Sequence, residues 1–340
     1  MARSPNGYRA DSPEAPVYDE AHKAFLQAFF ANSVFTFDAL KPVIASILEA
    51  QDPARRRLPD DITEAMINSL VQNTNAKIAP FDFEIRSARD QIKGERTYAL
   101  VNTASDTFTQ LATSFTPDEI AYIKRLLDEM FETNNSRTRE VMAVNQMRTK
   151  QLAKAPPRDR QSQAATQMEA DKDPTEVDVS AKSITHADCD RVLQTLVSQG
   201  FFQRSKKFYY SLAPRGLLEL RNYLKETYNE PLAEDDEEEE EPIVRIRDCE
   251  GCKEIVTVGQ RCDNRDCGMR WHTRCANQYF GAQQDKRCPK CKTNWTGGTY
   301  VGEKADGRHK NSSTTGRNYG RQVPDEEEDE DEDAEGEDDD

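Results

Sequence analysis

Residues that can bind a metal ion are concentrated in the C-terminal third of the sequence. Seven of the eight cysteines fall between positions 249 and 291, together with a histidine. In order, these ligand candidates are Cys249, Cys252, Cys262, Cys267, His272, Cys275, Cys288 and Cys291. Thiolate sulfur and imidazole nitrogen are the usual ligands of structural zinc, which binds them in a closed tetrahedron. The sequence therefore predicts two zinc ions, with no open position for metal-assisted hydrolysis.

The spacing of these ligands explains how such a short segment folds. Two residues separate Cys249 from Cys252, so a tight turn brings both sulfurs to about 2.3 Å from one ion. Residues 243–297 are too few for a large apolar core. Metal binding must therefore supply much of the folding free energy of this segment.

The spacing alone allows either sequential pairs of ligands or an interleaved cross-brace. The order of the ligands, with histidine in the fifth place, matches that of cross-braced modules. On this match, one ion is assigned to Cys249, Cys252, His272 and Cys275. The other is assigned to Cys262, Cys267, Cys288 and Cys291.

The formal net charge of −16 is unevenly distributed. Residues 234–241 contain 8 acidic side chains and residues 325–340 contain 14, with no basic residue in either run. The rest of the chain carries 40 acidic and 46 basic side chains, so it is positive. Runs of like charge cannot bury themselves, so both are predicted to be disordered. The first run is expected to tether the zinc-binding segment and leave it free to reorient.

The chain carries no signal for a membrane or for secretion. No stretch approaches the roughly 18 uninterrupted apolar residues of a transmembrane helix, so no membrane partner is expected. The first residues also contain no apolar segment typical of a signal peptide. Clustered cysteines in a chain without such a signal favour reduced thiols that bind metal over disulfides.

Apolar periodicity predicts three helices and a hairpin between residues 18 and 115. The helices are expected to begin at Asp19, at Pro42 and at Asp61. Apolar residues then alternate through residues 81–102, with a turn at Gly94. Three helices followed by a hairpin is the order of a winged-helix domain.

A second, interrupted winged-helix pattern occupies residues 116–230. Helices are predicted from Thr116, over 136–153, from Thr185 and over 214–228, with a hairpin at 201–212. Residues 154–180 lack apolar periodicity and are predicted to be a disordered insertion.

The zinc-ligand pattern resembles that of the RING family of ubiquitin ligases. The similar residues read C-x-x-C…W-H-x-x-C…C-P-x-C-x-x-x-W, in a variant with cysteine fourth and histidine fifth. A plant-homeodomain reader of histone tails shares this ligand order. Such readers normally carry a tryptophan two residues before the seventh ligand, where this chain has Lys286. A histone-tail reader is therefore the less favoured alternative.

Two winged-helix units before a variant RING resemble the non-SMC element one family, a subunit of the SMC five–six complex. The stretches FDFEIR and YALVN within 81–102, and FYYSLAPRGLLELRNYLKETY at 208–228, carry this resemblance, which covers roughly 18–297. It implies a nuclear, chromosome-associated protein that acts in DNA repair and recombination. It also implies three partners: the MAGE-type subunit (non-SMC element three), the kleisin subunit (non-SMC element four) and the SMC five–six heterodimer.

The predicted fold is mainly α with small β hairpins: tandem winged-helix domains followed by a cross-brace two-zinc RING-like domain. The expected divisions are a disordered start at 1–17, winged-helix domains at 18–115 and 116–230, an acidic linker at 231–242, the RING-like domain at 243–297 and a disordered tail at 298–340.

The RING resemblance implies a ligase that positions a ubiquitin-loaded conjugating enzyme without a covalent nucleophile of its own. The expected contacts with that enzyme are Ile255, Val256, Tyr279, Pro289 and Lys292. Ile255 and Val256 are included because Gly251 stands where the family usually has an apolar residue. Intrinsic activity is expected to be weak without the MAGE-type partner.

Two other functions are compatible with the sequence. The winged helices favour a structural adaptor, with the zinc domain as a protein-interaction module. The basic residues within 136–160 and 242–324 favour weak binding to DNA phosphates.

Overall fold

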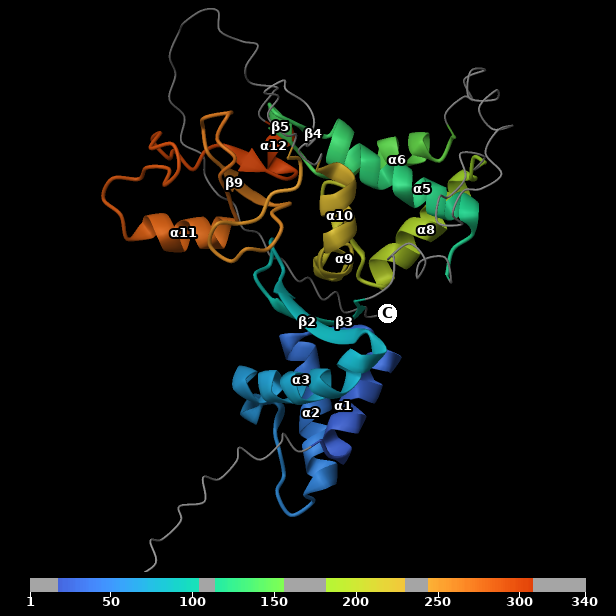
Figure 1. Cartoon of the computed structure of the whole chain (residues 1–340). Helices are drawn as coiled ribbons and strands as arrows, with labels where there is room; N and C mark the ends of the chain where they lie inside the picture. Colours follow the sequence, from blue (N-terminus) through green and yellow to red (C-terminus); the bar gives the residue numbers. More distant parts are fainter. Residues whose placement is uncertain (1–17, 104–113, 156–181, 230–243, 308–340) are drawn as a thin grey trace, which may run out of the picture. The chain divides into compact units, whose positions relative to one another are not determined.

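The computed structural model describes residues 18–103, 114–155, 182–229 and 244–307 (Figure 1). Predictions for residues 1–17, for the insertion beyond residue 155 and for both acidic runs lie outside the described residues. As predicted, the fold is helix-rich with small antiparallel sheets. Within the described ranges, no helix combines the length and the apolar character needed to cross a membrane.

The first winged-helix domain packs three helices against one antiparallel sheet (Figure 1). The helices are α1 (Glu20–Ala31), α2 (Phe37–Gln51) and α3 (Glu64–Ile78), with short 3-10 turns at Pro59–Asp61 and Ala79–Phe81. The strands β1 (Val34–Thr36), β2 (Phe83–Arg89) and β3 (Arg96–Asn102) pair in the order β1-β3-β2. The buried side chains at its centre include Phe25, Phe29, Leu40, Ile44, Ile67, Ile85 and Tyr98.

Two helices of this domain begin elsewhere than predicted, because threonine hydroxyls cap them. Thr36 accepts a hydrogen bond from the backbone of Ala39, so α2 begins before Pro42 and contains it. Thr63 caps α3 in the same way, whereas Asp61 belongs to the preceding 3-10 turn. Proline within α2 removes one backbone hydrogen bond, a cost that the buried face of the helix offsets.

The second winged-helix domain contains α5 (Pro117–Asp128), α6 (Gln146–Leu152), α8 (His186–Ser198) and a sheet in the order β6-β8-β7. Its strands are β6 (Val144–Asn145), β7 (Phe202–Arg204) and β8 (Tyr209–Leu212). A π-helical turn, Glu129–Thr133, extends α5 and leads into a hairpin of β4 (Asn135–Ser136) and β5 (Arg139–Glu140). The domain ends with α9 (Pro214–Glu219) and α10 (Arg221–Tyr228).

The helix predicted over 136–153 is wrong in its first half. Residues 141–144 are all buried, and Met142 has a left-handed backbone, with φ of 46°. Four consecutive buried residues do not fit a surface helix, which buries only one face. The chain instead forms the β4–β5 hairpin and strand β6 here. The helix begins at Gln146 because the side chain of Asn145 accepts a hydrogen bond from the backbone of Arg148.

Residues 244–307 form a module with a small sheet and two short helices, which we call the zinc-binding module after the metal predicted for it. Strands β9 (Gly259–Arg261), β10 (Arg270–Trp271) and β11 (Tyr300–Val301) pair in the order β10-β9-β11, with α11 (Thr273–Gly281) after β10. Ordered structure continues to α12 (Lys304–Gly307), beyond the predicted end at residue 297. The extension is held in place because Gly302 donates a backbone hydrogen bond to the Glu140 carbonyl at 2.8 Å.

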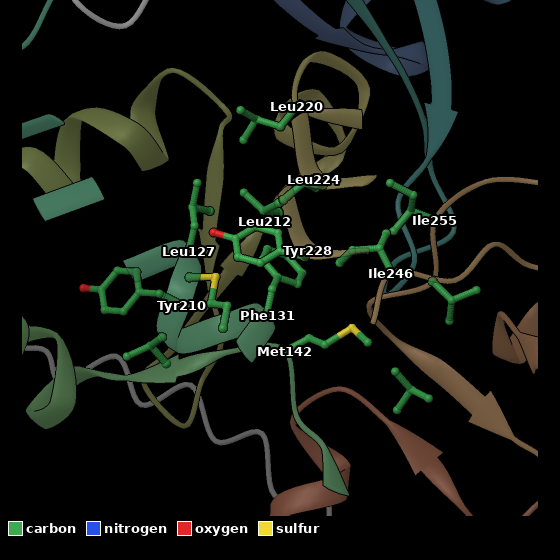
Figure 2. Close-up of a cluster of buried hydrophobic side chains, with 14 of the residues drawn as sticks. Leu127, Phe131, Met142, Tyr210, Leu212, Leu220, Leu224, Tyr228, Ile246 and Ile255 are labelled. Carbon is green, nitrogen blue, oxygen red and sulfur yellow. The ribbon is translucent and has the colours of Figure 1, made fainter. Parts of the chain in front are cut away.

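The second winged-helix domain and the zinc-binding module share one apolar core (Figure 2). Ile246 and Ile255 of the module belong to the same buried cluster as Phe131, Leu224 and Tyr228 of the domain. The backbones of Asn229 and Val244, which flank the acidic run, are also paired in an antiparallel bridge. These contacts contradict the prediction that the acidic run leaves the module free to reorient.

Candidate metal centre

The first group of ligands combines the first and third pairs of the predicted cross-brace. The ligand atoms of Cys249, Cys252, His272 and Cys275 all lie within 4.8 Å of one another. The Sγ atom of Cys252 is 3.2 Å from Nδ1 of His272. Cys249 and Cys252 lie in the loop before β9, whereas His272 and Cys275 lie at the start of α11. The arrangement is interleaved, not sequential.

The second group is formed by the remaining cysteines. Cys262, Cys267, Cys288 and Cys291 also place their sulfurs within 4.8 Å of one another. The Sγ atoms are 3.4 Å apart between Cys262 and Cys291 and 3.6 Å apart between Cys267 and Cys288. Tetrahedral ligands at about 2.3 Å from zinc are separated by a little under 4 Å, so both groups have the donor atoms and the size that zinc requires.

The backbone fixes which nitrogen of His272 faces the metal site. Nε2 lies 3.2 Å from the carbonyl oxygen of Ile255, to which it donates, so Nδ1 is left to bind the ion. A histidine ligand that donates its second nitrogen to a carbonyl is held in a single orientation. The segment around Ile255 therefore supports the first site without providing a ligand.

Hydrogen bonds lower the pKa of one thiol in each group. The hydrogen bond from Cys252 is the main cause that lowers the pKa of Cys249 to about 3. The hydrogen bond with the Thr293 side chain lowers the pKa of Cys291 to about 6. By contrast, burial raises the pKa of Cys267 and Cys275. Metal binding must therefore displace protons from Cys267 and Cys275.

A buried carboxylate joins the module to the second winged-helix domain. Glu140 on β5 is 6% exposed and accepts hydrogen bonds from Arg261 Nη1 and Arg270 Nε, both at 2.7 Å. Arg270 also contacts Glu140 through Nη2 and donates through Nη1 to the carbonyl of Cys267 at 3.0 Å. The second metal site is therefore connected to the winged-helix hairpin through one guanidinium.

Three of the five predicted contacts for a conjugating enzyme are accessible. Tyr279 is 38% exposed and stacks on Trp271, with ring centroids 4.8 Å apart. Pro289 is half-buried, and Lys292 is exposed and donates from Nζ to the Pro289 carbonyl at 2.9 Å. These residues lie on α11 and on the loop that contains the last two ligands.

The other two predicted contacts, Ile255 and Val256, are wrong. Their side chains are 2% and 1% exposed, so they offer no surface to a partner. Gln91, from the turn between β2 and β3, hydrogen-bonds the Ile255 carbonyl at 2.8 Å and the amide of Val258 at 2.8 Å. This segment contacts the first winged-helix domain instead of facing solvent.

Two family models match the chain. One, described as the Nse1 non-SMC component of the SMC5-6 complex, matches residues 22–220. The other, described as a RING-like domain, matches residues 249–291. The first match spans more than half of the chain. The chain belongs to the Nse1 family.

Curated relatives of this Nse1-family chain agree with that assignment. The human protein named non-structural maintenance of chromosomes element 1 homolog is 23% identical over 282 residues, covering 82% of this chain and 85% of the relative. The Schizosaccharomyces pombe protein named non-structural maintenance of chromosomes element 1 is 21% identical over 239 residues, covering 70% and 81%. A chain of a solved structure named "Nse1-Nse3-Nse4 complex" shares the fold, with a TM-score of 0.58 and 19% identity, over 82% of this chain and 98% of that one. The resemblance found in the sequence is confirmed.

Two residues that organise this Nse1-family site had no sequence signal. Glu140 and Gln91 reach partners more than a hundred positions away along the chain, and neither belongs to a recognisable motif. Their importance follows only from where the fold places them.

Replacing Thr293 with valine should make zinc leave at higher pH. The substitution removes the hydroxyl that lowers the pKa of Cys291, so protons compete with zinc for that sulfur at a higher pH. We expect the midpoint of acid-induced release, followed with a colorimetric chelator, to rise by about half a pH unit. Thr293→Ser keeps the hydroxyl and should match the unmodified chain; coincident midpoints for all three proteins would contradict this role.

Replacing Glu140 with glutamine should destabilise the module strongly. Two buried guanidiniums would then face a neutral amide, which typically costs about 3–5 kcal/mol of unfolding free energy. Urea unfolding can be followed by the fluorescence of Trp271 and Trp295, the two tryptophans of the chain. The control is Glu132→Gln, which alters an exposed carboxylate of the preceding turn and should change stability by less than about 0.5 kcal/mol. Equal urea midpoints for the two variants would show that the Glu140 carboxylate does not stabilise the module.

Proposed function

We propose that this Nse1-family chain is a RING-type ubiquitin ligase subunit of the SMC5-6 complex. In this proposal it acts in the nucleus on chromosomes, in DNA repair and recombination, and pairs with Nse3 and Nse4. The observation that carries the ligase proposal is the accessible group of Tyr279, Pro289 and Lys292 beside two four-ligand metal sites. The RING-like family match supports the ligase role, and the related Nse1-Nse3-Nse4 structure supports the pairing.

The residues around the metal sites are suited to binding, not to covalent chemistry. All eight ligands belong to closed groups of four, so bound zinc would hold the module in shape. Tyr279 and Pro289 would provide an apolar surface for the conjugating enzyme, and Lys292 a cation beside it. Holding the ubiquitin thioester in an attack-ready pose accelerates transfer to a substrate lysine through orientation alone. The single ammonium of Lys292 lacks the planar fork of arginine, which agrees with modest intrinsic activity.

A ubiquitination assay with purified Nse3 tests this mechanism. Combining Tyr279→Ala with Pro289→Ala should lower the rate about tenfold or more, because it removes the apolar contacts with the conjugating enzyme. Zinc content must stay unchanged, since Tyr279 also packs on Trp271. Phe208→Ala, which removes an aromatic side chain that is 53% exposed outside the module, should leave the rate unchanged. Full activity in the double variant would exclude this surface.

We infer a second, compatible role as an assembly subunit. Phe30 is 60% exposed and Phe81 72% exposed, and the ring of Phe30 lies 6.3 Å from that of Phe83. Phe81 precedes Phe83 by two residues, and we call Phe30, Phe81 and Phe83 the phenylalanine patch. Exposed aromatic clusters commonly mark protein–protein contacts. The patch on the first winged-helix domain is a suitable surface for pairing with the MAGE-type subunit.

The assembly role predicts that Phe30→Ser combined with Phe81→Ser weakens binding to purified Nse3. Loss of central aromatic contacts typically costs about 2 kcal/mol or more, so we expect at least a tenfold rise in the dissociation constant. The matched control is Phe208→Ser, also an exposed phenylalanine but on the second winged-helix domain. An unchanged dissociation constant in the double variant would rule out the patch as the pairing surface.

Weak binding to duplex DNA stays a prediction. The prediction was based partly on the basic residues within 136–160. Three of them, Arg137, Arg139 and Arg148, each form an ion pair with a carboxylate within the described structure.

A further inference from the structure

A cavity of about 440 Å³ lies where the β4–β5 hairpin meets the zinc-binding module. Its lining contains five arginines and no lysine: Arg137, Arg245, Arg247, Arg265 and Arg270. Three carboxylates also line it, from Glu132, Glu140 and Asp266, so the lining has a net positive charge. Its volume falls in the range of about 300–1,000 Å³ that is usual for ligand pockets. The function proposed above uses none of these arginines.

Two of the three carboxylates are already neutralised by arginines of the lining. Glu140 is paired with Arg270 in the buried network, and Asp266 is paired with Arg137. The third carboxylate, Glu132, is exposed to solvent. The backbone of Arg245 is fixed as well, because its carbonyl accepts a hydrogen bond from the Asn135 side chain at 2.9 Å. The walls of the cavity are therefore held in position by contacts that do not need a ligand.

Three arginines of the lining remain. Arg245 has an interaction of its own, which leaves Arg247 and Arg265. Within the part of the chain that the structure describes, neither guanidinium forms an ion pair or a side-chain hydrogen bond. Arg247 is half-buried, and its Nη1 atom lies against Gly268, where a Cβ atom would collide with it. Glycine at this position thus leaves room for a guanidinium that has lost much of its hydration and whose attraction to Glu140 and Cys267 involves no hydrogen bond. A half-buried cation of this kind favours an added anion.

We propose that this cavity binds the phosphate of a phosphorylated serine or threonine in a partner protein. A phosphate monoester carries a charge of about −1.5 to −2 at neutral pH and three acceptor oxygens. Guanidinium groups match those oxygens through paired N–H donors, which is why arginine clusters recognise phosphorylated side chains. A bound phosphate would lie where the winged-helix hairpin meets the zinc-binding module.

The shape of the site favours a side chain over duplex DNA. A duplex presents its phosphates on a broad convex surface, and proteins usually meet them with exposed cations that follow the backbone. Here Arg247 is half-buried and Arg265 is exposed, both line a concave surface, and lysine is absent from the lining. A single phosphate on a flexible side chain can reach the half-buried Arg247, which the broad convex surface of a duplex reaches less easily.

Binding can be measured with the full-length, zinc-loaded chain and short fluorescent peptides. The probes are Gly-Gly-Ala-Ser-Ala-Gly-Gly with phosphoserine, with unmodified serine and with aspartate at the central position. We expect the phosphoserine peptide to bind at least about tenfold more tightly than either of the others, because only phosphate combines two charges with three acceptors. Inorganic phosphate should displace it.

Substitutions then locate the site. Arg247→Gln combined with Arg265→Gln should weaken phosphopeptide binding by about tenfold or more, as expected when charge-assisted hydrogen bonds are lost. Arg56→Gln makes the same charge change at an exposed position of the first winged-helix domain and should have no effect. Arg265→Gln alone changes an exposed residue, so it tests the site even if the variant at Arg247 fails to fold. Zinc content and circular dichroism verify that each variant is intact.

Two outcomes would overturn the proposal. If the serine and phosphoserine peptides bind equally, or if no arginine variant changes the affinity, these arginines serve only to balance the charge of the nearby metal site with four cysteine ligands. If a labelled DNA duplex binds more tightly than the phosphopeptide and loses affinity in the same variants, the cavity is a nucleic-acid phosphate site. Neither outcome bears on ligase activity, which is measured separately through Tyr279 and Pro289.

Discussion

The contact between Glu140 and two buried arginines links the two halves of the C-terminal region. Taking a carboxylate and two guanidiniums out of water is costly, and the cost is offset only because the hydrogen bonds are short and several. The apolar core that surrounds this contact excludes water from it. Since Arg270 also holds the backbone of Cys267, the geometry of the second metal site depends on the winged-helix hairpin. Domain and module are therefore best regarded as a single folding unit.

The zinc-binding module shows how little apolar packing is needed once ligands supply stability. Its own core centres on Trp271, Phe280 and Trp295, with the rings of Phe280 and Trp295 stacked 4.6 Å apart. So few side chains would not hold a domain of this size without metal. Half of the ligands are buried, whereas Tyr279 is exposed and Pro289 half-buried beside them. The residues around the metal sites therefore include both the ligands and accessible apolar side chains.

Local chemistry made much of this structure predictable from sequence. The order of the ligands predicted both metal groups, Thr116 and Thr185 marked helix starts, and Gly94, with positive φ, marked a turn. Errors arose where tertiary packing outweighed a local signal. Helix α2 begins before Pro42 because Thr36 caps it. Residues 141–144 are not helical because all four side chains are buried. Ile255 and Val256 were misjudged because both side chains belong to the core that the module shares with the second winged-helix domain.

The carbonyl oxygen of Ile255 accepts hydrogen bonds from both Gln91 and His272. A carbonyl has two lone pairs, so both donors are accommodated at once. One acceptor therefore serves the hairpin of the first winged-helix domain and a ligand of the first metal site. Any coupling through this oxygen is reciprocal: if binding at the hairpin raises metal affinity, metal raises the affinity of that binding by the same factor. Metal retention and contacts of the first winged-helix domain would then change together.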